Sequence, residues 1–167
     1  FGKAIANGYP LGVIGGRKDI MDLFDHPNPA RRVLIAGTYN AHPVNAAAAI
    51  KVIEMLQNIE VYRQIDKVSK RLYEGLEIIF NAKGIPAITI NNASAFCTYF
   101  CDKAPTDLHD VLEHHNFDFD VKYRRALIKN GIYHIPIPAK QGSVSYAHSE
   151  ADIDYTLDIT SKIINKI

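Results

Sequence analysis

The sequence predicts an α/β fold in two parts, and two observations carry that prediction. The first is a helical segment over residues 44–56 that is apolar on almost every side and contains four consecutive alanines, as expected for a helix packed closely by its neighbours. The second is an amphipathic helical pattern over residues 62–82, after which strand and helix patterns alternate. From the composition near residues 57–60, we expect residues 1–57 to end one domain and residues 58–167 to form a smaller one.

Glycines and turn residues dominate the chain before the alanine-rich helix. Over residues 1–23 they interrupt an apolar pattern, which predicts short strands and tight turns around a bound ligand. We expect a short helix over residues 19–24, a surface loop over residues 25–29 and a short strand over residues 33–36. The helix over residues 44–56 should then be buried.

The second part reads as alternating helices and strands. The amphipathic helix should stop at Gly84, because glycine readily takes the left-handed conformation that ends helices. Two strands rich in branched and aromatic residues follow, over residues 85–90 and 96–101, with Asn91-Asn92 as their turn. The other predicted elements are a helix in two pieces over 107–130, strands over 133–136 and 143–147, and a final helix over 150–167, with Ser149 as its N-cap and Asp152 three residues on.

Composition narrows the class of protein. The 167 residues are 47% hydrophobic and 22% charged, which is ordinary globular material. The net charge of +1 argues against nucleic-acid and membrane-surface partners, which usually select for excess lysine and arginine. No long apolar run or leader pattern is present, so we expect a cytoplasmic location. Cys97 and Cys101 fall in one predicted strand, roughly 13 Å apart, and we expect free thiols in a reducing compartment.

Two short segments suggest cofactor chemistry. In Phe1-Gly2-Lys3-Ala4-Ile5-Ala6-Asn7-Gly8-Tyr9-Pro10, one lysine stands among small residues and can bring its amine close to a flat cofactor. The polar turn Gly37-Thr38-Tyr39-Asn40-Ala41-His42-Pro43 opens the alanine-rich helix, whose exposed amides favour an anion such as phosphate. We expect Asn40 and His42 to be hydrogen-bonded structural groups in this turn.

These segments resemble those of the class III aminotransferases, in the branch that contains glutamate-1-semialdehyde aminomutase. Gly2-Lys3-Ala4-Ile5-Ala6-Asn7-Gly8, followed by Pro10-Leu11-Gly12 and Gly15-Gly16-Arg17, matches the context of the family's cofactor lysine. Gly37-Thr38 and Pro43 match its Gly-Thr-x-x-x-x-Pro turn, in a form that leans toward the transaminases. The segment from Val144 to Asp154 resembles the closing strand and helix start of the aminomutases.

The resemblance implies a fold type I pyridoxal phosphate-dependent transferase. Residues 1–57 would be the carboxy-terminal end of the large cofactor-binding domain and residues 58–167 the small carboxy-terminal domain of a longer protein. The cofactor would be pyridoxal 5'-phosphate, and the enzyme a homodimer that acts on a small amino or keto substrate. A fragment of this kind is expected to be inactive by itself.

The resemblance also implies roles for Lys3, Gly37 and Thr38. Lys3 would form the cofactor aldimine and move a proton between substrate and cofactor, whereas the alternative is an exposed surface lysine. Gly37 and Thr38 would hold the phosphate of a cofactor centred in the partner subunit. Alternatively, Thr38 only caps the following helix.

Lys140 marks a departure from the aminomutase branch. The aminomutases have a Phe-Glu-Ala-Gly-Phe run before the closing strand, and the aligned run here is Ala139-Lys140-Gln141-Gly142-Ser143. A lysine in place of the acid would attract an anionic group of the substrate, so Lys140 is a candidate substrate-binding residue. The alternative is a solvated loop lysine.

The reaction and the other charged residues leave alternatives open. We expect amino transfer between a carboxylate-bearing amine and a keto acid, with intramolecular amino migration as one alternative and a non-catalytic dimerisation or binding module as another. His114 and His115 lack metal-ligand spacing, so we expect no metal and place both at the surface. The pairs Arg31-Arg32 and Arg124-Arg125 are expected to be solvated rather than substrate-binding.

Overall fold

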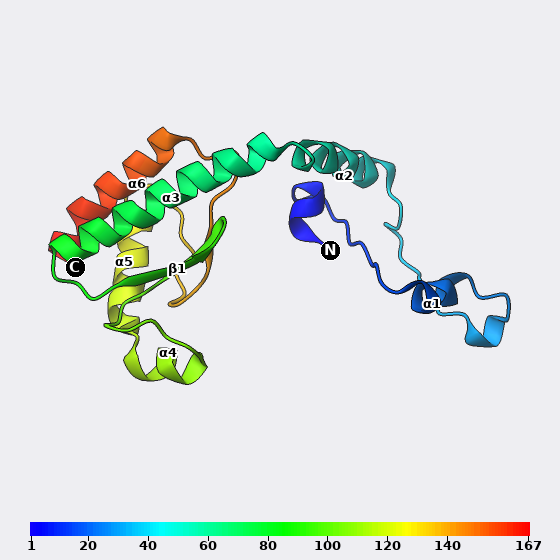
Figure 1. The fold of residues 1–167 in the computed structure, drawn as a ribbon, viewed down its shortest axis with the longest axis horizontal. Coiled ribbons are helices and arrows are strands. Elements are labelled where there is room, and N and C mark those ends of the chain that lie inside the picture. Colours follow the sequence, from blue (N-terminus) through cyan, green and yellow to red (C-terminus); the bar gives the residue numbers. More distant parts are fainter. The chain divides into compact units, whose positions relative to one another are not determined.

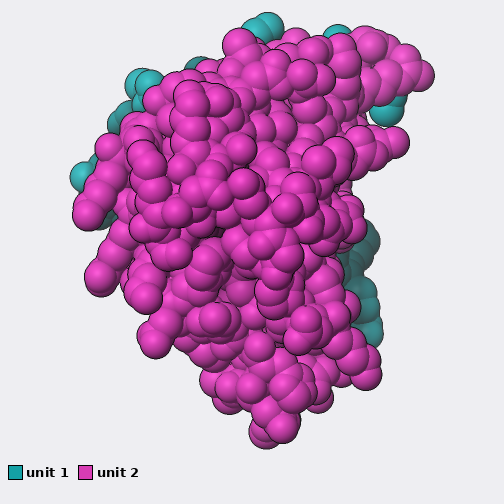
Figure 2. All heavy atoms as spheres, turned by 90° about the vertical axis from the view of Figure 1, so that its left-hand side faces the viewer, with its two compact units in different colours: residues 1–59 teal, residues 60–167 magenta.

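The computed structural model describes residues 1–167, which form two compact units, residues 1–59 and residues 60–167 (Figure 1). Figure 2 colours the atoms of the two units separately. The assignment of residues 1–57 to the end of a large domain and of residues 58–167 to a small carboxy-terminal domain stays a prediction.

Unit 1, residues 1–59, contains helices and turns but no strand. Its elements are η1 (Lys3–Ala6), α1 (Lys18–Met21), η2 (Asp22–Asp25), η3 (Pro29–Arg31) and α2 (Pro43–Leu56). The helix expected over residues 19–24 is present as α1 and η2, whereas the strands expected before residue 23 and over residues 33–36 are wrong. A strand needs a neighbouring strand that pairs with its backbone groups. Phe1 and Val13 exchange two backbone hydrogen bonds, at 2.7 and 2.8 Å, but this one pair of residues does not make a ladder.

The α2 helix forms where expected, but its expected burial is wrong. Only Asn45 and Ala49 are buried along it. The element that packs on it within unit 1 is η1, where Ala6 is fully buried and Pro10 O accepts a 2.6 Å hydrogen bond from the Asn45 amide. One short turn cannot cover an apolar helix, so several large side chains of α2 stay exposed: Val44, Ile50, Ile53, Met55 and Leu56.

Unit 2, residues 60–167, packs helices on a small antiparallel sheet in the order β1-β2-β3. The strands are β1 (Ile88–Asn92), β2 (Ala95–Tyr99) and β3 (Gly142–Ser143). The helices are α3 (Ile59–Ala82), α4 (Leu108–His114), α5 (Phe117–Lys129), α6 (Glu150–Ile163) and η4 (Ile164–Lys166). The long helix, the two-piece helix and the final helix are therefore confirmed.

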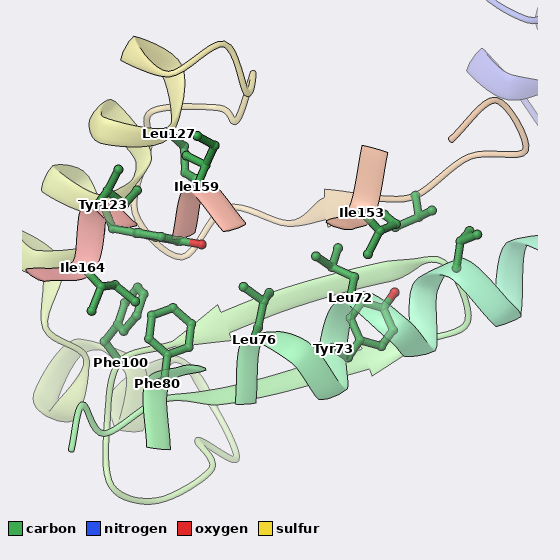
Figure 3. Close-up of a cluster of buried hydrophobic side chains, with 13 residues drawn as sticks. Leu72, Tyr73, Leu76, Phe80, Phe100, Tyr123, Leu127, Ile153, Ile159 and Ile164 are labelled. Atoms are coloured by element: carbon green, nitrogen blue, oxygen red, sulfur yellow. The ribbon is translucent and has the colours of Figure 1, made fainter. Parts of the chain in front are cut away.

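The core of unit 2 lies among α3, α5, α6 and the segment after β2 (Figure 3). Leu72, Leu76 and Phe80 recur every four residues on α3, so they share the face turned inward. Phe80 meets Phe100 and Tyr123 edge-on, with ring centroids 5.3 and 5.6 Å apart. Edge-to-face aromatic pairs add to the free energy gained by burial, so this cluster fixes how α3 and α5 meet.

Local signals set the helix ends in unit 2. Gly84 takes φ +64° and Gly131 takes φ +83°, and each closes the preceding helix with the paired backbone bonds of a Schellman motif. Asp107 and Asn116 cap α4 and α5 through their side chains. The predicted Ser149 cap is confirmed, with a full capping box to Asp152.

Three strand assignments in unit 2 need correction. Asn91 and Asn92 pair within β1, so the turn consists of the next residues, with Ala93 at φ +50°. Residues 133–136 form no strand, because a buried arginine, Arg124, binds Ile135 O and Pro136 lacks an amide hydrogen. The strand expected over residues 143–147 is reduced to β3, since the Ser145 amide bonds to the His148 ring instead of to a neighbouring strand.

Candidate functional site

Lys3 lies in a turn with an unusual backbone. It begins η1 at φ +53°, and Asn7 at φ +48° and Gly8 at φ +92° end the same turn. A non-glycine residue in the left-handed region costs about 1–3 kcal/mol, and such residues cluster at functional sites. The Asn7 amide donates to Ala4 O at 3.1 Å, which closes the turn. Lys3 itself is exposed, so its amine is free to reach a ligand.

The segment of residues 37–42 is a second strained turn in unit 1. The Asn40 amide donates to Gly37 O at 3.1 Å, and Ala41 takes φ +54°. The Asn40 side chain lies over Gly37 so closely that a Cβ there would sit 2.7 Å from Oδ1. A side chain at position 37 would therefore require the Asn40 side chain to move.

The amino end of α2 leaves polar groups open. The N-cap is His42, and it makes no side-chain capping bond; the capping role weighed for Thr38 is therefore wrong. His42 Nδ1 is buried without a hydrogen-bond partner, which corrects the expectation that this ring is hydrogen-bonded. Thr38 is exposed. An uncapped helix start beside an orphaned ring nitrogen and a free hydroxyl suits an anion, so these residues fit a phosphate group.

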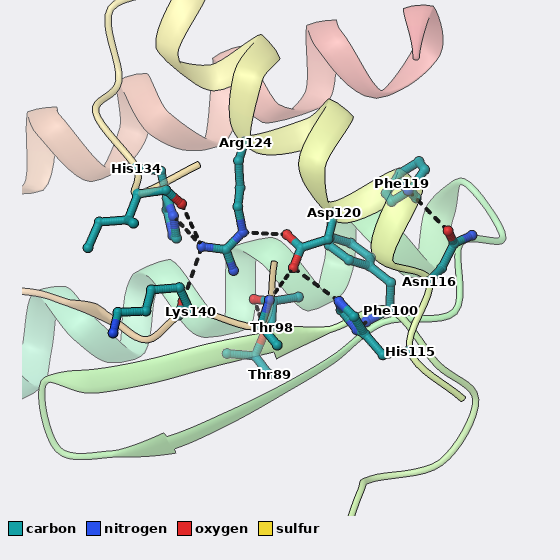
Figure 4. Close-up of polar contacts among 12 residues, drawn as sticks. Thr89, Thr98, Phe100, His115, Asn116, Phe119, Asp120, Arg124, His134 and Lys140 are labelled. Atoms are coloured by element: carbon teal, nitrogen blue, oxygen red, sulfur yellow. Dashed lines mark hydrogen bonds and ion pairs between the residues drawn. The ribbon is translucent and has the colours of Figure 1, made fainter. Parts of the chain in front are cut away.

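Lys140 lies in unit 2 and is exposed. Its carbonyl accepts a 3.1 Å hydrogen bond from Arg124 Nη1, and its side chain extends away from that arginine (Figure 4). The backbone before it is constrained, since Ala139 takes φ +52°. The candidate residues are thus divided: Lys3, Gly37 and Thr38 belong to unit 1 and Lys140 to unit 2.

A buried polar network beside Lys140 was missed by the sequence analysis. Arg124 and Asp120 are 2% and 1% exposed and form an ion pair one helical turn apart on α5. Asp120 Oδ2 also accepts from His115 Nε2 at 3.1 Å and from the Ala139 amide at 2.7 Å. Arg124 Nη1 points at His134 Nδ1, 2.8 Å away. Figure 4 shows these contacts converging from α5 and the loop segments around it.

The network fixes the protonation of both histidine rings. A guanidinium group only donates hydrogen bonds, so His134 Nδ1 must accept and the ring is neutral. Burial lowers the pKa of His134, and the charge of Arg124 lowers it further. His115 Nδ1 accepts from the Phe100 amide at 3.1 Å, so its hydrogen is on Nε2, directed at Asp120. The network therefore contains one anion and one cation.

Two expectations about charged residues are wrong as a result. Arg124 is not a solvated surface charge, although its neighbour Arg125 is exposed. His115 is buried, whereas His114 is exposed. The available signal was the i, i+4 spacing of Asp120 and Arg124 between apolar core positions of α5, because buried charges are usually paired.

The cysteines are free, as expected, and both are buried. Burial raises the pKa of both thiols, so both stay protonated and poorly nucleophilic. The structure contains no cluster of three or more His, Cys, Asp or Glu side chains that could hold a metal ion. None of its helices has the length and apolar character needed to cross a bilayer.

Comparison with known proteins identifies the family. The model of the aminotransferase class-III family matches residues 1–134. Glutamate-1-semialdehyde 2,1-aminomutase from Pyrobaculum islandicum is 34% identical over 99% of the chain, and the homologue from Pyrobaculum neutrophilum is 33% identical. The chain spans 38% of the length of these relatives.

Solved structures share the fold. An omega-transaminase from Sphaerobacter thermophilus superposes with a TM-score of 0.88 at 23% identity, covering 98% of this chain and 37% of that one. A glutamate-1-semialdehyde aminomutase from Pseudomonas aeruginosa PAO1, in complex with PMP, gives 0.71 at 14% identity over 84% of this chain and 31% of its own. The expected fold class, part of a fold type I pyridoxal phosphate-dependent transferase, is confirmed. The chain belongs to the class-III aminotransferase family.

Proposed function

We propose that the protein containing this chain uses pyridoxal 5'-phosphate to move an amino group from a carboxylate-bearing amine to a keto acid. The observation that carries this proposal is Lys3, an exposed lysine in a strained turn, within a chain of the class-III aminotransferase family. Because the chain spans 38% of its curated relatives, the activity is assigned to the longer protein. The 167-residue chain alone should be inactive.

Lys3 supplies two functions in this proposal. When bound, the cofactor contributes an aldehyde that condenses with amines and a ring that accepts electrons. The Lys3 amine is the nucleophile that holds the cofactor before substrate arrives. Once the substrate amine had replaced it, the Lys3 amine would be placed to act as general base and acid, moving a proton between the substrate carbon and the cofactor. The short turn of η1 fixes the backbone from which this side chain projects.

Gly37 and Thr38 bind the cofactor phosphate in the proposed homodimer. The exposed Thr38 hydroxyl and the open amides at the start of α2 are the donors, and the hydrogen bond from the Asn40 amide to Gly37 O closes the turn. These donors act on a cofactor centred in the other protomer. The His42 ring lies in the same turn, with its Nδ1 unpaired, and can donate when the hydrogen is on that nitrogen.

Lys140 selects the substrate in this proposal. Its exposed ammonium group attracts a carboxylate on the amine donor, and the attraction grows as water is excluded around the bound substrate. The buried network behind the Lys140 backbone keeps that residue in one place.

The second candidate function is migration of an amino group within one molecule. It is supported by the similarity of the chain to glutamate-1-semialdehyde 2,1-aminomutases, at 32–34% identity. The two reactions separate in a simple assay. A transaminase needs a keto acid to complete its cycle, whereas a mutase converts its substrate without a second reactant.

The Lys3→Ala variant of the full-length protein tests the proposal. Turnover should fall by several orders of magnitude, because covalent capture and proton transfer are both lost. The exposed Lys18, in the same unit, provides the matched control, and Lys18→Ala should keep wild-type turnover. Normal turnover in Lys3→Ala would refute the assignment and would favour a non-catalytic role for this chain.

A further inference from the structure

The buried arginine of α5 holds the segment of residues 134–140 at both ends. Arg124 Nη1 is directed at His134 Nδ1 at 2.8 Å and at Ile135 O at 3.1 Å. The same nitrogen reaches Lys140 O at 3.1 Å. This segment has no strand partner, so the guanidinium group replaces the ladder that would otherwise fix its backbone.

Asp120 holds the same segment from the other side of the guanidinium group. Its Oδ2 accepts the Ala139 amide at 2.7 Å, immediately before Lys140. Ala139 takes φ +52°, a conformation that alanine leaves unless other bonds enforce it. The carboxylate therefore fixes the direction in which the chain enters Lys140.

Burial makes this arrangement stiff. Asp120 and Arg124 are almost completely removed from solvent, and neither charge can leave its partner without a large electrostatic penalty. A planar guanidinium group also meets its acceptors in a fixed fork, which a flexible ammonium group cannot reproduce. The outer face of the segment carries the exposed Lys140 side chain. The buried ion pair therefore holds the backbone of a segment whose exposed side carries the Lys140 ammonium group.

We propose that Asp120 and Arg124 are positioning residues that hold Lys140 where it distinguishes acidic from neutral amine donors. This inference rests on the substrate role proposed for Lys140, and it adds the pair that sets that role. Neither Asp120 nor Arg124 touches substrate.

The first test measures the segment without any substrate. In hydrogen exchange of the full-length protein, the Ala139 amide should be protected, because it donates to a buried carboxylate. Arg124→Lys keeps the charge that Asp120 needs but loses the fork, so exchange in residues 133–143 should accelerate by at least about tenfold. Arg125→Lys, at the adjacent exposed arginine, should leave it unchanged. Equal protection in Arg124→Lys and wild type would overturn the proposal.

The second test measures substrate choice as a double-mutant cycle between Arg124 and Lys140. Lys140→Gln should lower the kcat/KM preference for acidic over neutral donors by about tenfold, as expected for one charged contact. Arg124→Lys should lower it in the same direction, mainly through KM. In the Lys140→Gln background, Arg124→Lys should have little further effect, because it acts through Lys140. Additive losses would mean that Arg124 acts independently of Lys140 and would overturn the proposal.

Failure of the proposed function is distinguishable from failure of this inference. If Lys3→Ala kept normal turnover, the proposed function would fail, but the hydrogen-exchange difference between Arg124→Lys and wild type would still be expected. That measurement needs neither cofactor nor substrate. Accelerated exchange in Arg124→Lys with an unchanged donor preference would show an anchored segment with no part in substrate choice, and would overturn the specificity role alone.

Discussion

The two units of this chain differ in how many of their apolar side chains they bury. Unit 2 has a continuous core of aromatic and branched side chains, and side-chain caps begin α4, α5 and α6. Unit 1 buries only Ala6, Asn45 and Ala49 and leaves the apolar side chains of α2 exposed. Unit 2 thus has the means to fold on its own contacts, whereas unit 1 needs further surfaces. The curated relatives extend well beyond the part that this chain matches.

The strained residues are distributed in a way that complements this contrast. Four of the non-glycine residues at positive φ lie in the candidate segments: Lys3, Asn7, Ala41 and Ala139. In unit 2, Ala139 is held by a buried carboxylate. In unit 1, Lys3 and Ala41 are held by turn hydrogen bonds at the surface. The chemistry proposed for unit 1 therefore depends on contacts from outside it, and the substrate segment of unit 2 does not.

Separating the units should give the largest effect. Residues 60–167 expressed alone should unfold in one cooperative transition, because the core and the caps are complete within that segment. Residues 1–59 alone should show no cooperative transition and should bind a hydrophobic dye through the exposed face of α2. Urea titrations followed by circular dichroism would measure both, and cooperative unfolding of residues 1–59 would contradict the contrast.

Breaking the buried ion pair should have the next largest effect. Asp120→Asn leaves the Arg124 charge buried without a partner, so the free energy of unfolding of residues 60–167 should fall by about 3–5 kcal/mol. The exposed Asp118 on the same helix is the matched control, and Asp118→Asn should cost less than about 1 kcal/mol. A similar small loss in both variants would mean that Arg124 reaches solvent in solution.

Acid should produce a smaller effect through His134. Burial lowers the pKa of this ring in the folded state, so its contribution to stability is complete above the ordinary value near 6.5 and is lost as pH falls below it. The neighbouring charges are Arg124, which opposes the added proton, and Asp120, which favours it.

Urea titrations of residues 60–167 from about pH 7 down to about pH 5 should show this loss, with a slope from His134 of at most about 1.4 kcal/mol per pH unit. His134→Asn keeps an acceptor for Arg124 and removes the titration, so its profile should be flatter than that of wild type. Identical profiles in the two proteins would show that His134 does not titrate against Arg124.

The sequence predicted unit 2 better than unit 1 for a physical reason. Helix periodicity, Gly84 and the Ser149 cap are local signals, and each appears in the structure as predicted. The strands expected near residues 33–36 and the burial of α2 depend on partners that unit 1 does not supply. In unit 2, the strand expected over residues 133–136 does not form, because Arg124 binds Ile135 O. This contact joins residues of two different segments, so no local sequence pattern shows it.

The residues of the candidate site also differ in how far the sequence could predict them. Lys3, Gly37 and Thr38 could be selected because their neighbours form recognisable short motifs. The network of Asp120 and Arg124 could not, because its members come from α5 and from loops that meet only in three dimensions. The open ring nitrogen of His42 was equally unpredictable, since burial without a partner is a property of the folded turn.

Chemical trapping of the cofactor tests the central claim, that Lys3 in unit 1 is the residue that binds it. The full-length protein, loaded with pyridoxal 5'-phosphate and reduced with borohydride, would be digested and its peptides analysed by mass spectrometry. We expect a single pyridoxyl-modified peptide, containing Lys3, which disappears in Lys3→Ala while Lys18→Ala retains it. Modification of another lysine, or of none, would contradict the account.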